Sequence, residues 1–470
     1  MKITLKNIGI FKQAEYELGD FTIICGQNNT GKTYATYTLY GFIDFFIRGY
    51  QIDIPDNRIN SLFEKGTENI DLTEFIKKHQ EIIKTACNKY KIFLPYVFAS
   101  NESRFTNSEF LLEVESNSFK LTTDSSFNRT LNFTENDILQ LTKEAHSNFL
   151  SISFPNETKE IQNPSTIAII KKEISRAIKV IIFKNVFLNI FIISTERTGI
   201  SIFEDDITAN LHNRLIKRIT LSPSLDINEI IEEFYNSPYP LPITKNISFI
   251  SQLKDIMKLS SYIEKEHSDI IADFSNILGG DYRVDREGLW FVPQKAKGVK
   301  LGMGESSSSV RSLLDVGFYL KHIAQKGDLL MIDEPELNLH PENQRKIARL
   351  LVRLVNVGIK VFVTTHSDYI IKELNTLIML NYKKESEVIK ELMKKYNYDK
   401  SELISQDRIK VFIAREEPTM LEQNTRKVKI PNLVPAKYDE FYGIEVESFD
   451  KTIDEMNKLQ KSIMFESLFL

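Results

Sequence analysis

The stretch LLMIDEPELNLHP, from Leu329 to Pro341, decides the expected fold. Apolar residues lead directly into Asp333 and Glu334, and a short loop follows. A continuous apolar run is typical of a parallel strand that is buried on both faces, and the ligands of open α/β sheets bind at the carboxyl ends of such strands. We therefore expect Asp333 to hold Mg²⁺ through a water molecule and Glu334 to orient or deprotonate an attacking water. A core strand followed by a charged loop is the alternative that this stretch alone leaves open.

A second motif, GQNNTGKT from Gly26 to Thr33, matches the pattern G-x-x-x-x-G-K-[ST] at every fixed position. It lies between a β-rich run at 21–25 and a helix-like run at 34–46, which is the context that the pattern requires. Glycines let the backbone wrap around phosphate, and the helix that follows presents its positive end to the same anion. An ordinary glycine-rich turn is the alternative, which the acid pair near the other end of the chain disfavours.

The residue types of this loop suggest individual roles. We expect Lys32 to reach the β- and γ-phosphates and Thr33 to give its hydroxyl to Mg²⁺. The expected nucleotide contacts within the loop are Gly26, Asn28, Asn29, Thr30, Gly31, Lys32 and Thr33.

The strand expected after the acid pair ends at a histidine. A helix with Pro341 at its first position and Gly358 at its end precedes the apolar run 359–365, which leads into His366. One β-α-β unit returns the chain to the same edge of a parallel sheet. We therefore expect His366 to contact the γ-phosphate rather than to have a purely structural role.

A run of four serines, 306–309, precedes a segment with helical periodicity at 310–324, upstream of the acid pair. Serines are good N-caps, and this is the structural alternative. A helix start lined with hydroxyl groups can also bind an anion. Ser307 and Ser308 are therefore candidate nucleotide contacts.

The composition indicates a soluble, cytoplasmic protein of two or three domains. The 470 residues are 42% hydrophobic, which is enough for a sizeable core, and the net charge of −4 gives no overall basic field for nucleic acid. The two cysteines, Cys25 and Cys87, offer neither a disulfide framework nor a metal site. The most apolar stretch, 180–194, is interrupted by Lys184 and is too short to span a bilayer.

Two polar features in the middle of the chain are ambiguous. Glu196 and Arg197 follow a strong apolar run, which places them either at a strand end near the nucleotide or in a solvated turn with a local ion pair. Lys172, Arg176 and Lys179 share one helical stripe, which either follows the phosphates of DNA or is a solvated face. These three residues are the candidates for a DNA contact.

The ordered motifs resemble those of the ABC-type ATPases. Gly26 to Thr33 is similar to a Walker A loop and Leu329 to Glu334 to a Walker B strand, while Asn338 to His340 falls where a D-loop would lie and His366 where the switch histidine would lie. The acid and histidine segments resemble the SMC/RecF-like branch that includes the overcoming-lysogenization-defect (OLD) proteins. They are especially similar to stand-alone bacterial ATPases of that branch, many of which occur in phage-defence systems of the Septu and PARIS types.

This resemblance implies an α/β fold, a P-loop ABC-ATPase head in which a mixed sheet with flanking helices is assembled from both ends of the chain around a largely helical insertion. It implies ATP and Mg²⁺ as cofactors and Mg-dependent ATP hydrolysis, with Glu334 and His366 as catalytic residues. It also implies a homodimer or larger ring, in which the signature sequence of one subunit caps the ATP of another.

The expected domains follow the motifs. They are the N-terminal part of the head (1–50), a helical linker with an antiparallel sheet (51–135), a mainly helical insertion (136–295), the C-terminal part of the head (296–380) and a C-terminal lobe that completes the head or docks a neighbour (381–470).

The sequence departs from the family pattern at two motifs. The usual signature, Leu-Ser-Gly-Gly-Gln, is represented only by the serine run, and His340 stands where many transporters carry aspartate. No residue is identified as the lid-loop glutamine. OLD nucleases also carry a metal-binding domain that needs paired aspartates, and 381–470 contains neither Asp-x-Asp nor histidine, so we expect no nuclease site.

The sequence leaves two main functions of different classes. One is an ATP-driven dimerisation switch that controls a separate effector protein in bacterial anti-phage defence. The other is a DNA-binding ATPase of the RecF or SMC type, acting in repair. An OLD-like nuclease is a third, which the C-terminal residues disfavour. We expect no membrane partner.

Overall fold

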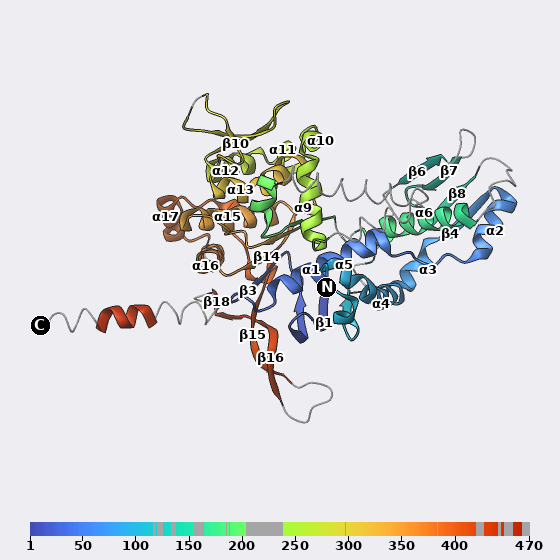
Figure 1. Cartoon of the computed structure of the whole chain (residues 1–470), viewed down its shortest axis with the longest axis horizontal. Helices are drawn as coiled ribbons and strands as arrows, with labels where there is room; N and C mark the ends of the chain where they lie inside the picture. Colours follow the sequence, from blue (N-terminus) through green and yellow to red (C-terminus); the bar gives the residue numbers. More distant parts are fainter. Residues whose placement is uncertain are drawn as a thin grey trace, which may run out of the picture. The chain divides into compact units, whose positions relative to one another are not determined.

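The computed structural model describes residues 1–115, 119, 126–132, 138–154, 164–184, 186–187, 189–203, 238–296, 298–382, 384–419, 427–439, 443–445 and 455–462. The chain divides into two compact units, each built from segments that are far apart in the sequence (Figure 1). Unit 1 comprises residues 1–3, 39–93 and 109–189, and unit 2 comprises residues 4–38, 94–108 and 190–470. The helical segments expected between 204 and 237 lie outside the described residues.

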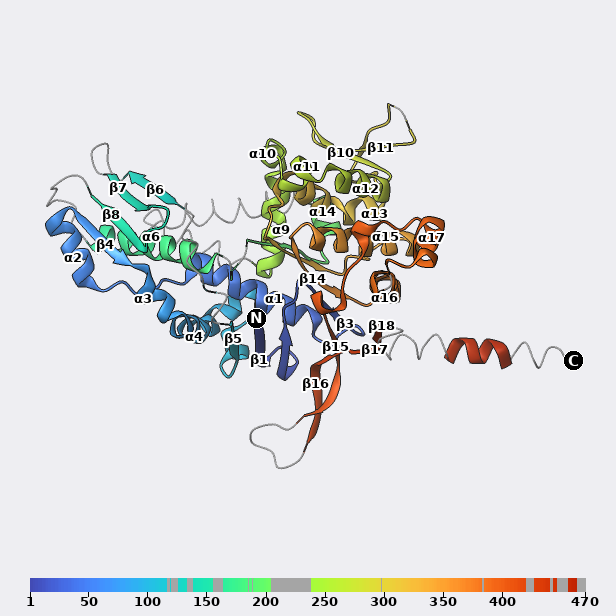
Figure 2. The same ribbon diagram turned by 180° about the vertical axis from the view of Figure 1, so that it is seen from behind.

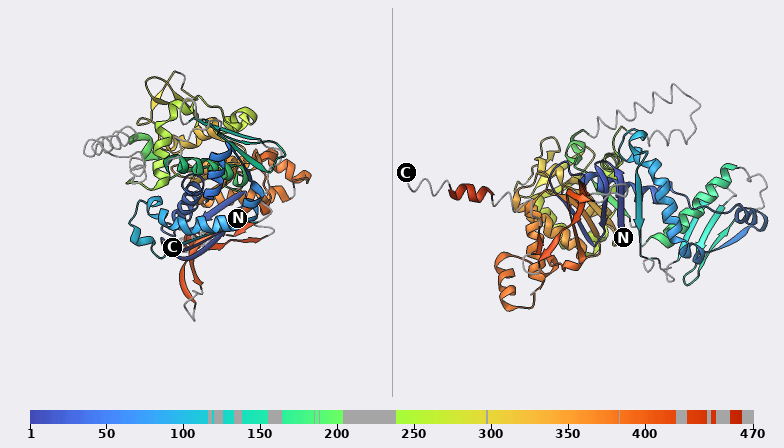
Figure 3. Two further views of the ribbon diagram at one scale, coloured as in Figure 1. Left: turned by 90° about the vertical axis from the view of Figure 1, so that its right-hand side faces the viewer. Right: turned by 90° about the horizontal axis from the view of Figure 1, so that it is seen from below.

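Unit 2 is organised around a sheet of six strands in the order β16-β15-β3-β14-β13-β9. The strands are β3 (Phe21–Cys25), β9 (Ile190–Ile193), β13 (Leu329–Asp333), β14 (Lys360–Thr365), β15 (Ile409–Thr419) and β16 (Val428–Pro435). All neighbours are parallel except β15 and β16, which form an antiparallel hairpin that extends beyond the rest of its unit (Figures 1, 2 and 3). The expected α/β fold, with a mixed sheet assembled from both ends of the chain, is confirmed.

The other elements of unit 2 flank this sheet or form smaller sheets. The helices are α1 (Lys32–Asp44, whose second half belongs to unit 1), α5 (Leu94–Val97), η3 (Glu102–Phe105), α9 (Leu241–Ser251), α10 (Leu253–Ile256), α11 (Tyr262–Glu266), α12 (Ser268–Leu278), α13 (Ser308–Ser312), α14 (Leu314–Phe318), η6 (Tyr319–Ile323), α15 (Pro341–Asn356), α16 (Asp368–Tyr382), α17 (Glu387–Tyr396), η7 (Lys400–Glu402) and η8 (Gln406–Arg408). The further strands are β1 (Lys2–Ile8, whose first two residues belong to unit 1), β2 (Phe11–Glu17), β10 (Gly280–Val284), β11 (Leu289–Pro293), β12 (Leu301–Gly302), β17 (Lys437–Asp439) and β18 (Gly443–Glu445).

Both faces of the central sheet are covered, which explains why its middle strands are apolar throughout. Alternate residues of a strand point to opposite faces. On one face, residues such as Ile332 and Val363 join the main core cluster with the apolar stripes of α15 and α16. On the other face, Phe362 lies 6.2 Å, between ring centroids, from Tyr16 of β2, whose hydroxyl donates to the carbonyl of Ala35 in α1.

The register of the parallel strands brings their carboxyl ends together. Asp333 pairs with Thr364, Thr365 pairs with Cys25, and Ile332 pairs with Ile193. The segments that follow β3, β9, β13 and β14 therefore begin at one edge of the sheet, where ligands of open α/β sheets bind.

Unit 1 combines helices with an antiparallel sheet. Its elements are η1 (Phe45–Gly49), α2 (Asp56–Lys65), β4 (Thr67–Asp71), α3 (Leu72–Lys77), α4 (His79–Tyr90), η2 (Lys91–Phe93), β5 (Glu109–Glu113), β6 (Phe127–Asn132), β7 (Ile138–Lys143), β8 (Phe149–Ser153) and α6 (Pro164–Phe183). The sheet has the order β4-β8-β7-β6, with antiparallel neighbours. The ring of Phe42 contacts those of Tyr90 and Phe110, with centroids 5.3 and 4.6 Å away.

Strands β7 and β8 lie where helix was expected from residue 136 onward, so that part of the expectation was wrong. Leu139 and Leu141 of β7 are buried, as are Leu150 and Ile152 of β8, whereas their neighbours point the other way. This spacing of two is the periodicity of a half-buried strand. The hairpin expected at 281–293 is present as β10 and β11.

The basic stripe expected on α6 is also incomplete. The Nζ atom of Lys179 is buried and donates to the backbone carbonyls of Phe46, Ile47 and Tyr50, at 2.9, 2.9 and 2.5 Å. Burial lowers the pKa of Lys179 to about 8. Lys179 therefore caps the end of η1 and is not available to DNA, whereas Lys172 and Arg176 are exposed.

Within the described residues, no helix is long and apolar enough to cross a membrane.

Candidate functional site

The loop between β3 and α1 is tight because two of its positions do not accept a side chain. Gly26 has a φ of +146°, and a Cβ atom there would lie 2.6 Å from the carbonyl oxygen of Ala414. Gly31 has a φ of +91°, and a Cβ atom there would lie 2.6 Å from the ring of Phe11. Glycine at both positions lets the backbone curve around an anion at the start of α1.

Lys32 extends back over this loop. Its side chain is largely buried, and Nζ donates to the carbonyls of Gly26 at 2.9 Å and Gln27 at 2.8 Å. Burial lowers the pKa of Lys32, and the nearby carboxylates at the end of β13 act in the opposite direction. The ammonium group therefore lies between the loop and the acid groups, where phosphate oxygens could replace its carbonyl partners.

Asp333 joins the loop to the sheet edge. Its carboxylate accepts a hydrogen bond from the hydroxyl of Thr33 at 3.3 Å and a second from the hydroxyl of Thr364. Burial raises the pKa of Asp333 to about 6, against the hydrogen bond from Thr364, which lowers it. A cation beside this carboxylate would offset the cost of burying its charge.

The oxygen atoms of Thr33 and Asp333 suit Mg²⁺. This ion prefers oxygen ligands and is usually bound by one or two protein groups together with substrate phosphates and water. Over the described parts of the chain, no group of three or more His, Cys, Asp or Glu side chains could hold a metal ion alone. The two residues therefore fit a metal that arrives with a nucleotide.

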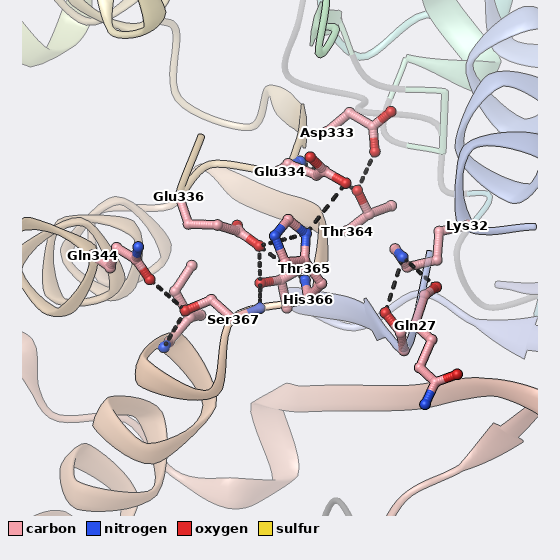
Figure 4. A network of polar contacts seen from close by, with 12 residues as sticks. Gln27, Lys32, Asp333, Glu334, Glu336, Gln344, Thr364, Thr365, His366 and Ser367 are labelled. Carbon is pink, nitrogen blue, oxygen red and sulfur yellow. Dashed lines mark hydrogen bonds and ion pairs between the residues drawn. The ribbon is translucent and has the colours of Figure 1, made fainter. Parts of the chain in front are cut away.

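Glu334 lies at the start of the loop after β13, close to His366 (Figure 4). Its backbone conformation is unusual for a residue other than glycine. Its φ is +52°, and its backbone N–H donates to the carbonyl of Thr364 at 3.1 Å. Its Oε1 atom lies 3.3 Å from Nδ1 of His366, which follows β14. The hydrogen bond between the two lowers the pKa of Glu334 and raises that of His366.

The carboxylate of Glu336 accepts hydrogen bonds from the segment that carries His366. Glu336 was not singled out from the sequence. Its Oε1 atom accepts from the hydroxyl of Thr365 at 2.6 Å and from the backbone N–H of His366 at 2.8 Å. Nδ1 of His366 lies 3.5 Å from the same oxygen. Burial raises the pKa of Glu336. A third carboxylate so close to an acid pair was the available sequence signal.

The residues after β9 resolve an alternative that the sequence left open. Arg197 is fully buried and donates to the carbonyls of Asp333 at 2.8 Å and Glu334 at 2.6 Å, so the solvated-turn alternative was wrong for this residue. Glu196 is exposed, and its carboxylate lies 3.4 Å from the hydroxyl of Tyr37 on α1. Both residues thus lie at the same sheet edge as Asp333.

A cavity of about 610 Å³ lies beside Thr33. It has a polar end at Thr33 and Glu196 and an aromatic wall at Tyr34, Tyr37 and Phe98. The ring centroids of Tyr34 and Phe98 are 5.0 Å apart. The cavity gives the loop a neighbouring space with both polar and aromatic walls.

The serine run contacts its own segment. Ser307 is the N-cap of α13, where its hydroxyl accepts from the N–H of Val310 at 3.4 Å and shares a hydrogen bond with Ser309. Ser307 and Ser308 are both exposed. The structure therefore shows the capping role, and it brings together Lys32, Thr33, Asp333, Glu334 and His366 without these two serines.

A family model described as AAA ATPase domain matches residues 1–371. No curated protein matches the chain. The similar solved structures include an SmcHead bound to the C-winged helix domain of ScpA, 12% identical with a TM-score of 0.30, covering 92% of this chain and 97% of that chain.

Two further structures are an SMC head domain from Thermotoga maritima and an Smc head domain with an extended coiled coil bound to the C-terminal domain of ScpA, derived from Pyrococcus furiosus. The first is 10% identical with a TM-score of 0.28, covering 93% of this chain and 98% of that chain. The second is 12% identical with a TM-score of 0.28, covering 98% of each chain. Because these sequence identities and TM-scores are low, the family assignment rests on the family model alone.

Proposed function

We propose that this chain, which belongs to the AAA ATPase domain family, binds ATP at residues 26–33 and hydrolyses it with Mg²⁺. The main support is that three sets of residues meet at one sheet edge: the loop of Lys32, the hydrogen-bonded pair Thr33 and Asp333, and the pair Glu334 and His366. An acid that binds metal, a second acid and a phosphate loop together are the parts that phosphoryl transfer to water requires.

The phosphate-binding part of the proposal uses the loop and its lysine. The proposed nucleotide contacts in this chain are Gly26, Asn28, Asn29, Thr30, Gly31, Lys32 and Thr33. Thr33 and Asp333 would hold Mg²⁺, which, when bound, supplies positive charge beside the phosphates. Lys32 would exchange the carbonyls of Gly26 and Gln27 for phosphate oxygens.

The chemical step is assigned to Glu334 and His366. The lowered pKa of Glu334 keeps its carboxylate ionised, so it can orient the attacking water and accept its proton. His366 holds this carboxylate through Nδ1, while Glu336 fixes the backbone of the histidine. The remaining ring nitrogen, Nε2, is then the group that we assign to the γ-phosphate.

We assign Ser307 and Ser308 to the ATP of a second copy. They are exposed, and they begin α13, whose last residue, Ser312, accepts a hydrogen bond from Arg197 at that sheet edge. Two copies would then close over two nucleotides and reopen after hydrolysis, as a homodimer or as part of a larger ring. The head is proposed to comprise 1–50 and 296–380 together with β9 and with β15 and β16 of 381–470, which belong to the same sheet. The rest of 381–470 is proposed to dock a neighbour.

The biological role rests on the resemblance of the motifs alone. We propose that the switch is the sensor or regulator of a bacterial anti-phage defence system and controls a separate effector. A DNA-binding role in repair is less supported, because Lys179 is buried and Lys171 pairs with Asp56 at 2.6 Å. Lys172 and Arg176 are the basic residues of the stripe that stay exposed.

The first test is ATP hydrolysis by the purified chain with Mg²⁺ and with a chelator, together with its mass in solution with and without ATP. We expect Mg-dependent phosphate release and an ATP-dependent increase in mass. Absence of hydrolysis at every protein concentration would refute the enzyme proposal.

A pull-down of the Glu334→Gln form from its host separates the two biological roles. A stoichiometric protein partner would support the regulator of an effector, whereas bound DNA without a protein partner would support a role in repair.

A further inference from the structure

Arg197 uses its side chain entirely on backbone carbonyls. Its guanidinium group is fully buried. Nε donates to the carbonyl of Ser312 at 2.8 Å, Nη1 to those of Ser194 at 2.7 Å and Asp333 at 2.8 Å, and Nη2 to that of Glu334 at 2.6 Å. One side chain thus joins the ends of β9, β13 and α13.

This arginine is not the partner of an acid. Among the described residues, no carboxylate lies within ion-pairing distance of its guanidinium group, and Asp315, the acid with the largest electrostatic effect on it, has no hydrogen-bond partner for either oxygen. A buried charge without a close counterion costs free energy unless its hydrogen bonds are made. The four carbonyl bonds use four of the five N–H donors of Arg197, and they restrain the four backbone groups that accept them.

One of these groups belongs to Glu334. A residue other than glycine is strained at a φ of +52°, so its conformation needs support from the surrounding structure. The N–H of Glu334 is held by Thr364, and its carbonyl is held by Arg197 and by the N–H of Leu337 at 3.0 Å. Arg197 therefore restrains the backbone that aims the Glu334 carboxylate.

The opposite end of the contact is the serine helix. Ser312 is buried and is the last residue of α13, the five-residue helix that Ser307 caps. A displacement of α13 would move the Ser312 carbonyl, and with it the guanidinium group bonded to Glu334. The two ends are linked by one rigid, planar group.

We propose that Arg197 is a positioning residue that couples α13 to Glu334, so that the catalytic carboxylate is aligned only when α13 is in place. This inference rests on the proposed function, in which Glu334 acts on water and the serines of α13 meet the ATP of a second copy. In this proposal, the position of the serine run affects the alignment of Glu334 in the same chain.

The test compares Arg197→Lys with Arg353→Lys. Lysine keeps the charge, but one nitrogen cannot reach carbonyls on three segments. Arg353 is also a largely buried arginine, which pairs with Asp269 and Asp273 of α12, away from the acid pair, so it is the matched control. For Arg197→Lys we expect kcat to fall roughly 10²-fold with ATP affinity nearly unchanged, as misplacement of a reacting group predicts. For Arg353→Lys we expect kcat to be unchanged.

A double-mutant cycle on kcat then tests the coupling to the serines. If Arg197 transmits the position of α13, Ser307→Ala with Ser308→Ala should cost much less in Arg197→Lys than in the wild type. Equal costs in both backgrounds would overturn the coupling. A loss of ATP affinity and melting temperature, with kcat of the bound enzyme intact, would reduce Arg197 to a structural residue.

Hydrogen exchange separates failure of this inference from failure of the proposed function. In a folded Arg197→Lys protein, the amides of Leu337 and Leu339 should exchange faster than in Arg353→Lys, whether or not the chain hydrolyses ATP. Unchanged exchange would overturn the positioning role. An inactive wild type with the expected exchange pattern would overturn the proposed function alone.

Discussion

The two halves of the candidate site are held in different ways. The phosphate loop is stabilised by contacts within a few residues, such as Lys32 to Gly26 and the hydroxyl of Thr30 to the carbonyl of Gln27 at 2.7 Å. The acid half is held by contacts across the sheet, from β9 and β14 to the end of β13. The hydrogen bonds of the phosphate loop therefore join residues that are close in the sequence. The hydrogen bonds of the acid half can form only after the strands have paired.

This difference predicts that changes in the two halves will affect different kinetic quantities. Changes in the local half should mainly affect the affinity for ATP, because that loop has phosphate as its partner. Changes in the acid half should mainly affect turnover, because its contacts orient the groups that act on water.

The largest effect is expected in the acid half. Glu334→Gln removes the proton acceptor but keeps the shape of the side chain, so kcat should fall by about 10³-fold, within the range for general-base catalysis. ATP affinity should stay close to that of the wild type. Steady-state hydrolysis and nucleotide titration measure the two quantities. Glu342→Gln, an exposed carboxylate paired with Lys346 in the first turn of α15, is the control. Undiminished turnover in Glu334→Gln would show that another group activates water.

In the local half, Lys32→Ala should weaken ATP binding by roughly 10²-fold, because charge-assisted hydrogen bonds to phosphate are among the stronger ones. Lys346→Ala removes an exposed lysine from α15 and should leave the affinity unchanged. Titration with a fluorescent ATP analogue measures both. A Lys32 variant that bound ATP normally but turned it over slowly would contradict the proposed division between the two halves.

A third prediction examines the support of His366. Glu336→Gln keeps the Oε1 acceptor for Thr365 and for the N–H of His366, whereas Glu336→Ala leaves both donors without it. We expect kcat to fall by about 10-fold in the alanine variant, the cost of unsatisfied buried donors, and only slightly in the glutamine variant. Equal losses in the two variants would mean that the charge of Glu336, rather than its acceptor geometry, matters.

The same difference explains what the sequence could predict. The strands around 21–25 and 329–333 were recognisable because an unbroken apolar run suits a strand covered on both faces. The phosphate loop was recognisable because its spacing is local. Arg197 was left ambiguous, since nothing near it in the sequence shows that three of its four carbonyl partners lie 115 to 137 residues away. Lys179 was misassigned for the same reason, because its carbonyl partners lie 129 to 133 residues earlier.

The smallest effect is a shift in the titration of His366. The Glu334 carboxylate favours the protonated imidazole, so the pKa of His366 is raised above its usual value of 6.5. The stabilisation from this pair is complete below the unfolded-state pKa and is lost as the pH rises through the higher folded-state pKa. Glu334→Gln should therefore lower the pKa of His366, measured by NMR of histidine-labelled protein. If the pKa of His366 did not change in Glu334→Gln, Glu336 rather than Glu334 would be the acid that raises it. Glu336 would then position and charge the histidine, and Glu334 would act on water alone.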